Sequence, residues 1–329
     1  MIKFTATSSE HNSRLDRFLR KRLPLLGLSG IYGLIRKGAV RIGGKKAKQD
    51  YRLKEGDILE IDVNESEFEA RDNTSGQDKI AGLSKTEFFK RNFHILYEDA
   101  YILVCNKPAG LVVHSGSGHD HHDNLVDLAA AYILSKEKDP QKTEVPVLMH
   151  RLDRDTSGVI LLAKNKGVVR ALHADMRDGK FTKQYIAVCH NRPPEFEGTV
   201  TFEMKRGGGS RLGMKMNIST DGEGLASSTT YKILGYQNDL SQLEILLHTG
   251  KTHQIRVHMA HIGAPVLGDV RYGDQRLDDK VFSSAVSDRS APIPRRLYLH
   301  AHKLSFPHPH NKKKMTVTAK PPEEFLRLF

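Results

Sequence analysis

A short, strongly charged stretch between two apolar runs is the feature that most constrains the fold of this chain. Residues 150–158 contain one histidine, two arginines and two aspartates, and they separate the apolar runs 145–149 and 159–163. Apolar runs of this length predict buried strands, so the charged stretch is expected to be the loop between them. Loops held by rigid strands often carry catalytic side chains, although a solvated turn with local ion pairs explains the charge more simply from composition alone.

The positive charge of the chain is concentrated in one segment. The formal net charge is +12, which favours polyanionic partners. Residues 14–48 contain eleven Lys or Arg and one acid, Asp16, so this segment alone carries 11 − 1 = +10. A solvated helix face normally mixes both signs, and one-sided charge predicts contact with a phosphate backbone. The candidate contact residues in this segment are Arg14, Arg17, Arg36, Lys37, Arg41 and Lys45.

The hydrophobic pattern divides the chain into two domains. Helical spacing predicts a first helix after Ser13 and a second after Ser29 that ends at Gly38, followed by strands, which gives a small basic domain over residues 1–63. Residues 64–92 are polar and predict a linker. Residues 93–329 predict an α+β domain with a mixed, mainly antiparallel sheet flanked by helices.

Within the larger domain the pattern is specific enough to place several elements. Helices are predicted at 124–134 and 165–176, and strands at 181–190, 229–236 and 243–248. Glu98-Asp99 marks a hairpin, and Thr252 is expected to cap a short helix. Alternation along 181–190 places Tyr185, Ala187 and Cys189 on one face of the strand.

The two cysteines, the first residues of the chain and the lengths of its apolar runs indicate a cellular compartment. Cys105 and Cys189 lie in apolar runs and are expected to be buried, reduced thiols. The first residues lack the apolar core of a secretion signal, and no run of about eighteen apolar residues occurs. The expected location is the cytosol.

Two resemblances extend this interpretation. The segment His150-Arg151-Leu152-Asp153-x-x-Thr156-Ser157-Gly158 resembles the signature of the RluA-type pseudouridine synthases, and segments 106–110, 250–258, 268–273 and 297–301 follow in that family's order. The order of motifs over 14–57 resembles the S4 RNA-binding domain. The resemblance implies an enzyme that isomerises uridine to pseudouridine in RNA, with large-subunit ribosomal RNA as substrate and partner, and with no cofactor or metal.

The same resemblance implies roles for individual residues. Asp153 corresponds to the catalytic carboxylate, and Arg256 to the arginine that pairs with it; from the sequence alone Arg256 is more simply a charge on a surface helix. Tyr185 corresponds to the tyrosine that packs against the target base and helps to remove the C5 proton, and its simpler interpretation is a core tyrosine. Arg151 corresponds to the residue that fills the space of the flipped base, with a phosphate contact as the alternative.

Three further residues are candidates for contact with RNA: Arg154, Lys251 and His253. Lys251 stands where the family usually has arginine, which keeps the charge but removes a bidentate fork. Residues 225–231 also match the family pattern loosely. Both departures bear on the choice of substrate rather than on the aspartate, the tyrosine or Arg256.

Other functions remain open on the sequence alone. Asp153-Arg154-Asp155-Thr156 fits the start of a Mg-dependent phosphotransferase of the haloacid dehalogenase type, with Asp278-Asp279 as its later acidic pair. Metal binding is an alternative for the histidines, which are His114, His119, His121, His122, His258 and His261. A catalytically silent rRNA-binding assembly factor is the third alternative.

Overall fold

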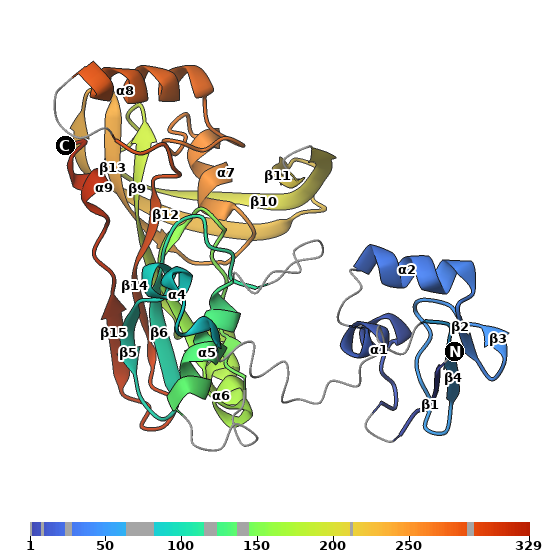
Figure 1. The fold of residues 1–329 in the computed structure, drawn as a ribbon. Coiled ribbons are helices and arrows are strands. Elements are labelled where there is room, and N and C mark those ends of the chain that lie inside the picture. Colours follow the sequence, from blue (N-terminus) through green and yellow to red (C-terminus); the bar gives the residue numbers. More distant parts are fainter. Residues whose placement is uncertain are drawn as a thin grey trace.

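The computed structural model describes most of the 329-residue chain (Figure 1). The described residues are 2–7, 10–23, 28–63, 82–114, 124–136, 145–210, 213–287 and 293–329. Within these ranges the strands form a small sheet near the N-terminus of the sequence and a large sheet from residue 95 onward. Each sheet packs against its own buried apolar clusters, in agreement with the two folded units that the hydrophobic pattern predicts.

The small sheet packs against two helices. Its elements are β1 (Ile2–Thr5), α1 (Leu15–Arg22), α2 (Leu28–Lys37), β2 (Val40–Ile42), β3 (Lys45–Lys46) and β4 (Ile58–Ile61). The strands are ordered β1-β4-β2-β3 with antiparallel neighbours. Helical spacing buries Leu15, Leu19 and Ile31 in one cluster, so the two helices and the strands after them are confirmed. Strand β1 was not predicted.

The predicted N-cap serines of these helices are wrong. Helix α1 begins two residues after Ser13, and the N–H of Leu15 donates to the carbonyl oxygen of Tyr51 at 2.8 Å. A side-chain cap is unnecessary where a neighbouring loop supplies the acceptor. Helix α2 already begins one residue before Ser29. The predicted end of α2 is confirmed, because Gly38 has φ +79° and closes the helix in a left-handed conformation.

The large sheet contains eleven strands. They are β5 (Ile95–Glu98), β6 (Ile102–Lys107), β7 (Val147–Leu148), β8 (Ser157–Ala163), β9 (Thr182–His190), β10 (Glu197–Ser210), β11 (Gly213–Ser219), β12 (Leu225–Gln237), β13 (Leu240–Leu247), β14 (Leu299–Pro307) and β15 (Lys314–Thr318). The main path is β11-β10-β12-β13-β9-β14-β8-β6-β5, with β15 beside β14 and β7 beside β8. The described pairs are antiparallel except β14 with β8, so the mixed, mainly antiparallel sheet is confirmed.

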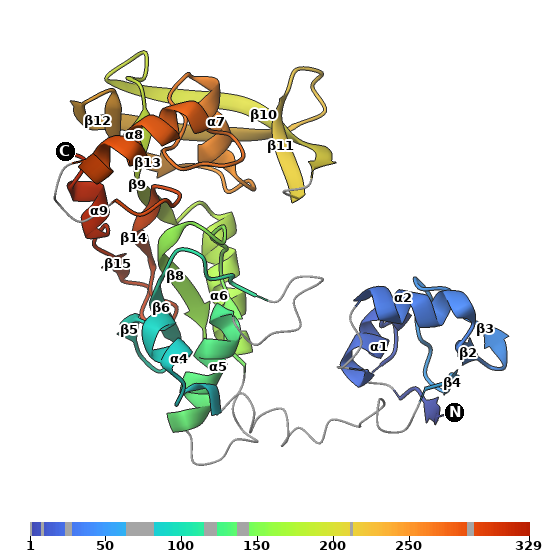
Figure 2. The ribbon, with the colours of Figure 1, turned by 45° about the horizontal axis from the view of Figure 1, so that its top comes forward.

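Helices cover the large sheet at both ends. They are α4 (Glu87–Asn92), α5 (Leu125–Lys136), α6 (Lys166–Arg177), α7 (Gln254–His261), α8 (Gln275–Ser287) and α9 (Glu323–Leu326). Figures 1 and 2 place α7 and α8 at one end, where β10 and β11 extend as an arm, and α4, α5 and α6 at the other. Cys105 and Cys189 are buried free thiols, as predicted. Among the described residues no helix is long and apolar enough to cross a membrane.

The linker expected over residues 64–92 is shorter at its C-terminal end. Residues 64–81 lie outside the described part of the chain, but residues 87–92 form α4. Thr86 caps this helix by accepting a hydrogen bond from Phe89 N at 3.1 Å, and Phe88 and Phe89 pack against the core of the large sheet. We infer that the large domain begins before residue 87 rather than at residue 93, because the apolar face of α4 is part of its core.

The two apolar runs around the charged loop differ in burial. Residues 159–163 lie in β8 and are buried, as predicted. In contrast, β7 has only two residues, and Val145 and Val147 are 62% and 39% exposed. The predicted burial of this first run is therefore confirmed for Pro146 and Met149 but wrong for Val145 and Val147. The reason is that β7 pairs only with the far end of β8, Val147 opposite Ala163, so one of its faces stays in solvent.

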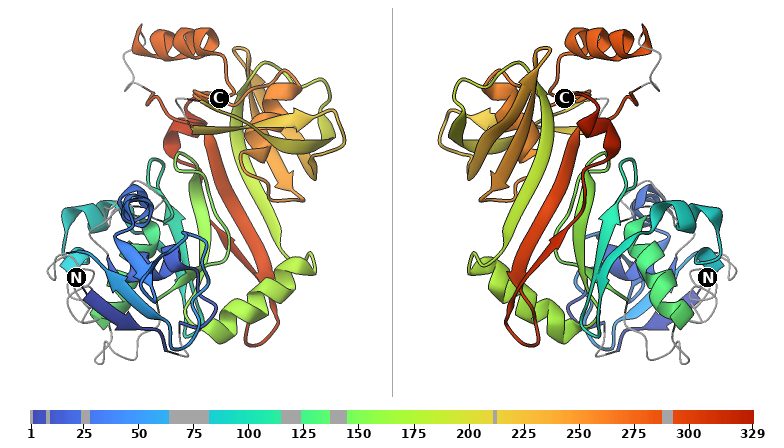
Figure 3. Two further views of the ribbon diagram at one scale, coloured as in Figure 1. Left: turned by 90° about the vertical axis from the view of Figure 1, so that its right-hand side faces the viewer. Right: turned by 90° about the vertical axis from the view of Figure 1, so that its left-hand side faces the viewer.

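Strand β14 joins the two halves of the large sheet. It runs antiparallel to β9 and, at His300 and Ala301, parallel to β8. Figure 3 shows β9 and β14 as long strands side by side. Gly158 of β8 has φ +115°, and a Cβ at this position would overlap the carbonyl oxygen of Ala301. Glycine therefore permits the close approach that sets the charged loop against a strand from far along the chain.

Candidate active site

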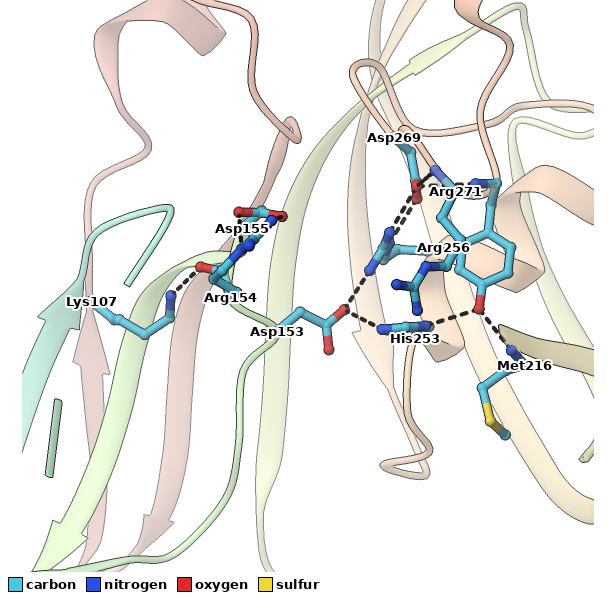
Figure 4. Close-up of polar contacts among 10 residues, drawn as sticks. Lys107, Asp153, Arg154, Asp155, Met216, His253, Arg256, Asp269 and Arg271 are labelled. Atoms are coloured by element: carbon cyan, nitrogen blue, oxygen red, sulfur yellow. Dashed lines mark hydrogen bonds and ion pairs between the residues drawn. The ribbon is translucent and has the colours of Figure 1, made fainter. Parts of the chain in front are cut away.

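The charged loop is fixed at its base by a buried lysine. Lys107, at the end of β6, donates from Nζ to the carbonyl oxygens of Pro108 (2.9 Å) and Leu111 (2.7 Å). It also donates to the carbonyl oxygen of Arg154 at 2.7 Å, as Figure 4 shows. Burial lowers the pKa of Lys107 to about 7, and the three acceptors match the three N–H donors of its charged form. The backbone directly after Asp153 is therefore held in place.

Asp153 projects from this loop and forms an ion pair with Arg256 of α7 (Figure 4). Nη1 of Arg256 donates to Oδ2 of Asp153 at 3.0 Å, while Nε and Nη2 donate to Asp269 at 2.7 and 2.8 Å. Burial opposes the charge of Arg256, but the hydrogen bonds and charge of Asp269 raise its pKa. Burial likewise opposes the charge of Asp269, and Arg256 lowers that pKa. A permanent positive charge is thus held beside Asp153.

His253 lies on the other side of Asp153 and is positioned by Tyr272. Its Nδ1 is 2.9 Å from the hydroxyl of Tyr272, which also accepts a hydrogen bond from the N–H of Met216 on β11 at 2.9 Å. Burial lowers the pKa of His253, against the opposing charge of Asp153, which favours the neutral ring. The tautomer that receives the Tyr272 hydrogen at Nδ1 carries its proton on Nε2, 3.8 Å from Oδ2 of Asp153.

The backbone of His253 explains why the predicted helix cap is wrong. Thr252 was expected to cap α7, but His253 is the N-cap residue and lies in the left-handed region, with φ 56° and ψ 18°. The side chain of Gln254 instead accepts hydrogen bonds from Lys251 N (3.0 Å) and Thr249 Oγ1 (2.8 Å), which closes the turn. A non-glycine residue in this conformation is strained by roughly 1–2 kcal/mol, and the strained residue here faces Asp153.

Tyr185 of β9 faces the same site. Tyr185, Ala187 and Cys189 belong to one buried cluster and Ile186 and Val188 to another, so the predicted alternation is confirmed. The Tyr185 hydroxyl forms no hydrogen bond with any residue in the described ranges, and its side chain lines the cavity that contains Asp153. Burial, followed by the charge of Asp153, raises the pKa of Tyr185, so the phenol stays protonated.

These residues surround a cavity of about 590 Å³, within the size range of small-ligand sites. Arg151, Lys183 and Lys251 contribute basic side chains to its lining. Arg151 is exposed and has no ion pair within the described part of the chain. The combination of one carboxylate, one aromatic ring and several cations suits a flat, polar group attached to a phosphate backbone.

The other candidate residues for RNA contact differ in their position and in their exposure to solvent. Arg154 is exposed but outside the cavity lining, and its guanidinium donates to Asp155 at 3.0 and 3.2 Å. His253 is half-buried within the site, as described above. In the N-terminal unit Arg14 is tied to Asp16 by hydrogen bonds of 3.1 and 2.9 Å. The remaining candidates there are exposed: Arg17, Arg36, Lys37, Arg41 and Lys45.

Three functional residues were missed by reasoning from the sequence: Lys107, Asp269 and Tyr272. Lys107 and Asp269 are almost fully buried, and a buried charge requires a partner. Both lie in segments whose order matches the family, 106–110 and 268–273, so the resemblance contained a signal. Their partners, a set of carbonyl oxygens and a distant arginine, left no local pattern in the sequence.

The geometry does not support the alternative functions. Asp155 pairs with Arg154, and Asp278 is buried against His190, at 2.7 Å, so these aspartates do not converge on Asp153 as a phosphotransferase would require. Within the described ranges no group of three potential metal ligands gathers. His258 contacts the Ser227 hydroxyl at 2.9 Å, and the candidates at 119, 121 and 122 lie outside the described residues.

Comparisons with known proteins agree with this geometry. Residues 101–261 match the family model described as RNA pseudouridylate synthase, and residues 13–59 match the S4 domain. The ribosomal large subunit pseudouridine synthase C of Buchnera aphidicola (subsp. Schizaphis graminum) is 37% identical over 311 residues, which cover 94% of this chain and 90% of that protein. The protein of the same name from Escherichia coli (strain K12) is 33% identical over 331 residues, covering 99% and 95%.

A solved structure with a similar fold is human RNA Pseudouridylate Synthase Domain Containing 4. It is 26% identical, with a TM-score of 0.56, and the match covers 76% of this chain and 95% of the human chain. The large sheet and its flanking helices are therefore the architecture that this group of proteins shares.

Proposed function

The chain belongs to the RNA pseudouridylate synthase family and is an isomerase that converts uridine to pseudouridine in RNA, and on this premise we propose that Asp153 is its catalytic carboxylate. The reaction breaks the N-glycosidic bond, turns the detached uracil and rejoins it to C1′ of the ribose through C5. C5 loses one proton and N1 gains one, so the composition of the nucleotide does not change. The protein must therefore supply a carboxylate at the sugar, a platform for the free base and a path for the proton.

The ion pair between Asp153 and Arg256 on the wall of the cavity is the observation that carries this proposal. A carboxylate beside the ribose can add to C1′ or remove the proton at C2′, and both reactions require it to be ionised. Arg256 donates a hydrogen bond to this carboxylate and places a positive charge beside it, and Asp269 holds the guanidinium in position. Arg256 and Asp269 thus act on the reaction through Asp153.

Tyr185 supports the detached uracil. Its ring lines the cavity and offers an aromatic face for stacking, and its hydroxyl is available to the base. Because the phenol is held protonated, the hydroxyl accepts the C5 proton only while it passes its own proton to another group. The carboxylate of Asp153, whose charge acts on the phenol, is the acceptor that we assign, and a proton then passes from it to N1, which restores the carboxylate.

Basic side chains at the cavity are suited to contact the RNA around the target uridine. The uridine must leave its stack before its sugar can reach Asp153, which costs a few kcal/mol. Arg151 is exposed and lines the cavity, and its planar guanidinium can stack in the space that the base vacates. Lys251 lines the same cavity and is suited to a backbone phosphate.

We assign large-subunit ribosomal RNA as the substrate and the cytosol as the location. Support for the substrate comes from the names of the two relatives, both ribosomal large subunit pseudouridine synthases. The S4 domain adds affinity for RNA through its exposed basic residues, which are Arg17, Arg36, Lys37, Arg41 and Lys45.

Tritium release from large-subunit rRNA transcripts that carry 5-tritiated uridine tests this function. The unmodified protein should release tritium at the same rate with and without EDTA, and Asp153→Asn should release none while retaining RNA binding. Tritium release by Asp153→Asn would remove Asp153 from the catalytic role. Binding without release by the unmodified protein would favour the assembly factor, and loss of release in EDTA would favour the metal-dependent alternative.

A further inference from the structure

The exposed face of α6 carries a stripe of basic residues. Lys166, Arg170, His173 and Arg177 are all exposed, and their spacing of four, three and four residues places them along one side of the helix. We call these four residues the α6 stripe. The acidic residue of α6, Asp175, is buried on another face and pairs with Lys180 and Lys312 at 3.0 and 2.9 Å. The stripe is therefore of one sign.

Solvation alone does not account for this pattern. The side chains of Arg170 and Arg177 form no ion pair or hydrogen bond with any residue in the described ranges. Helix α8, at the other end of the same domain in Figure 1, shows the usual mixture, because Arg276 and Lys280 alternate with exposed Asp279. An exposed helix that needs only solubility gains from both signs, through pairs three or four residues apart. Within the described residues, Arg170 and Arg177 of α6 lack such a pair.

The α6 stripe lies on a helix that borders the catalytic cavity through Met176. Met176, next to Arg177 and about 100° round the helix, lines the cavity that contains Asp153. Lys183 of β9 and Lys251 line the same cavity. Figure 3 shows α6 lying against the ends of the long strands β9 and β14.

We propose that the α6 stripe binds backbone phosphates of the RNA strand next to the target uridine. The inference rests on the proposed function, because it takes the occupant of the cavity to be a nucleotide of a longer RNA. Arg170 and Arg177 lie about 10 Å apart along the helix axis, a spacing suited to two phosphates of one strand. The contacts carry no sequence information and set the direction in which the RNA enters the site.

The test compares two matched double variants on a large-subunit rRNA transcript. Arg170→Glu with Arg177→Glu reverses the stripe, and Arg276→Glu with Lys280→Glu makes the same change of charge on exposed positions of α8. Kd is measured by filter binding over a range of salt in an Asp153→Asn background, so that no turnover occurs. KM and kcat are measured by tritium release with Asp153 intact.

The stripe variant should bind about tenfold more weakly at low salt, and its slope of log Kd against log salt should be about 1.5 smaller, because two phosphate contacts are lost. Its KM should rise with Kd while kcat changes less than about twofold. The α8 variant should match the unmodified protein in all four quantities.

An unchanged Kd and salt slope in the stripe variant would overturn the inference, and would leave a protein as the partner of this face. An equal loss in the α8 variant would also overturn it, since only net charge would then matter. Failure of the proposed function is read separately, from absence of tritium release by the unmodified protein. Arg170→Gln with Arg177→Gln loses the same two contacts and should give a similar change in slope with a smaller loss of affinity, and unfolding curves confirm that each variant folds.

Discussion

Asp269 accepts hydrogen bonds from two of the three guanidinium nitrogens of Arg256 and leaves Nη1 to reach Asp153. Asp269 thus clamps Arg256 in place while Arg256 donates its remaining hydrogen bond to Asp153. The clamp is nearly free of solvent, since Asp269 is 2% and Arg256 9% exposed. Its geometry needs the fork of a guanidinium, which a lysine ammonium lacks.

Arg256→Lys should therefore lower kcat by about 100-fold or more, because one ammonium group cannot hold both carboxylates. The measurement is single-turnover tritium release at saturating RNA. Arg295→Lys is the matched control, because Arg295 pairs with Asp279 at 2.8 Å on the surface, with both side chains 58% exposed. A variant at position 256 that turns over at the normal rate would show that the clamp is dispensable.

Tyr272→Phe should reduce kcat about tenfold with little change in KM, because His253 loses the group that fixes its ring and tautomer. Stability should fall by about 1 kcal/mol as the N–H of Met216 loses its acceptor. Kinetics of tritium release and urea unfolding measure the two effects. Tyr236→Phe, which removes an exposed hydrogen bond to Asp239, should leave kcat unchanged. Equal kcat in both variants would argue against a role for the Tyr272–His253 contact.

Tyr185→Phe separates stacking from proton transfer. The variant should bind RNA within about threefold of the normal Kd, because the ring remains, and should release tritium about 100-fold more slowly, because the hydroxyl that relays the C5 proton is lost. Tyr185→Ala should impair both. If Tyr185→Phe released tritium at the normal rate, stacking alone would account for this residue.

Glu98 should make the domain sensitive to acid. Burial opposes its charge, but hydrogen bonds from Lys164 (2.8 Å), Tyr132 (2.7 Å) and Lys136 (2.9 Å) lower the pKa of Glu98 to about 2, below the 4.5 of the free side chain. Because the folded pKa is the lower one, this stabilisation is present above pH 4.5 and is lost as the pH falls towards 2.

Glu98→Gln should accordingly cost about 2 kcal/mol of unfolding free energy at pH 7, after allowance for solvent screening, and progressively less at pH 4 and below. Urea unfolding over a series of pH values measures this difference. Glu87→Gln, which affects an exposed pair with Lys90, should change stability by less than about 0.5 kcal/mol. A penalty for Glu98→Gln that did not vary with pH would exclude titration as its source.

Gly158→Ala should destabilise the fold by about 3 kcal/mol or more, because the new Cβ meets the backbone of Ala301 at a residue with φ +115°. Gly33→Ala is a useful contrast, since Gly33 lies within α2 with no atom near its Cβ, and alanine there should stabilise by roughly 0.5 kcal/mol. Thermal unfolding of both variants is the measurement. Similar melting temperatures for the two would contradict the assigned contact.

Local patterns in the sequence predicted much of the fold. Period-two alternation placed Tyr185 on the face of β9 that lines the site, and helical spacing predicted α6 with its buried Val168 and Leu172. Such periodic patterns extend over a few residues, so they can be recognised in a short stretch of the sequence. The predictions of helix caps were wrong where the hydrogen-bond acceptor is distant in sequence. At the start of α1, the carbonyl oxygen of Tyr51 accepts a hydrogen bond in place of the Ser13 side chain.

The site itself was less accessible to such reasoning. Asp153 and Arg256 are 103 residues apart, and their pairing was predicted from resemblance alone. The left-handed backbone of His253 and the burial of Asp269 depend on how α7 and the segment after it pack, which no local pattern encodes. Charge in the sequence drew attention to the loop of Asp153, but the partners of each charge are visible only in the fold.

The position of β14 has a consequence for biosynthesis. This strand begins at residue 299 and yet lies between β9 and β8. During synthesis, both earlier strands therefore lack their shared neighbour until β14 has been made. Until the ribosome has released residues 299–307, the loop of Asp153 and the strand of Tyr185 belong to two half-sheets with no common neighbour between them. Long-range strand pairing of this kind forms slowly, so the active site is assembled late and in one step. A nascent chain can expose its basic N-terminal domain to RNA long before it can modify a uridine.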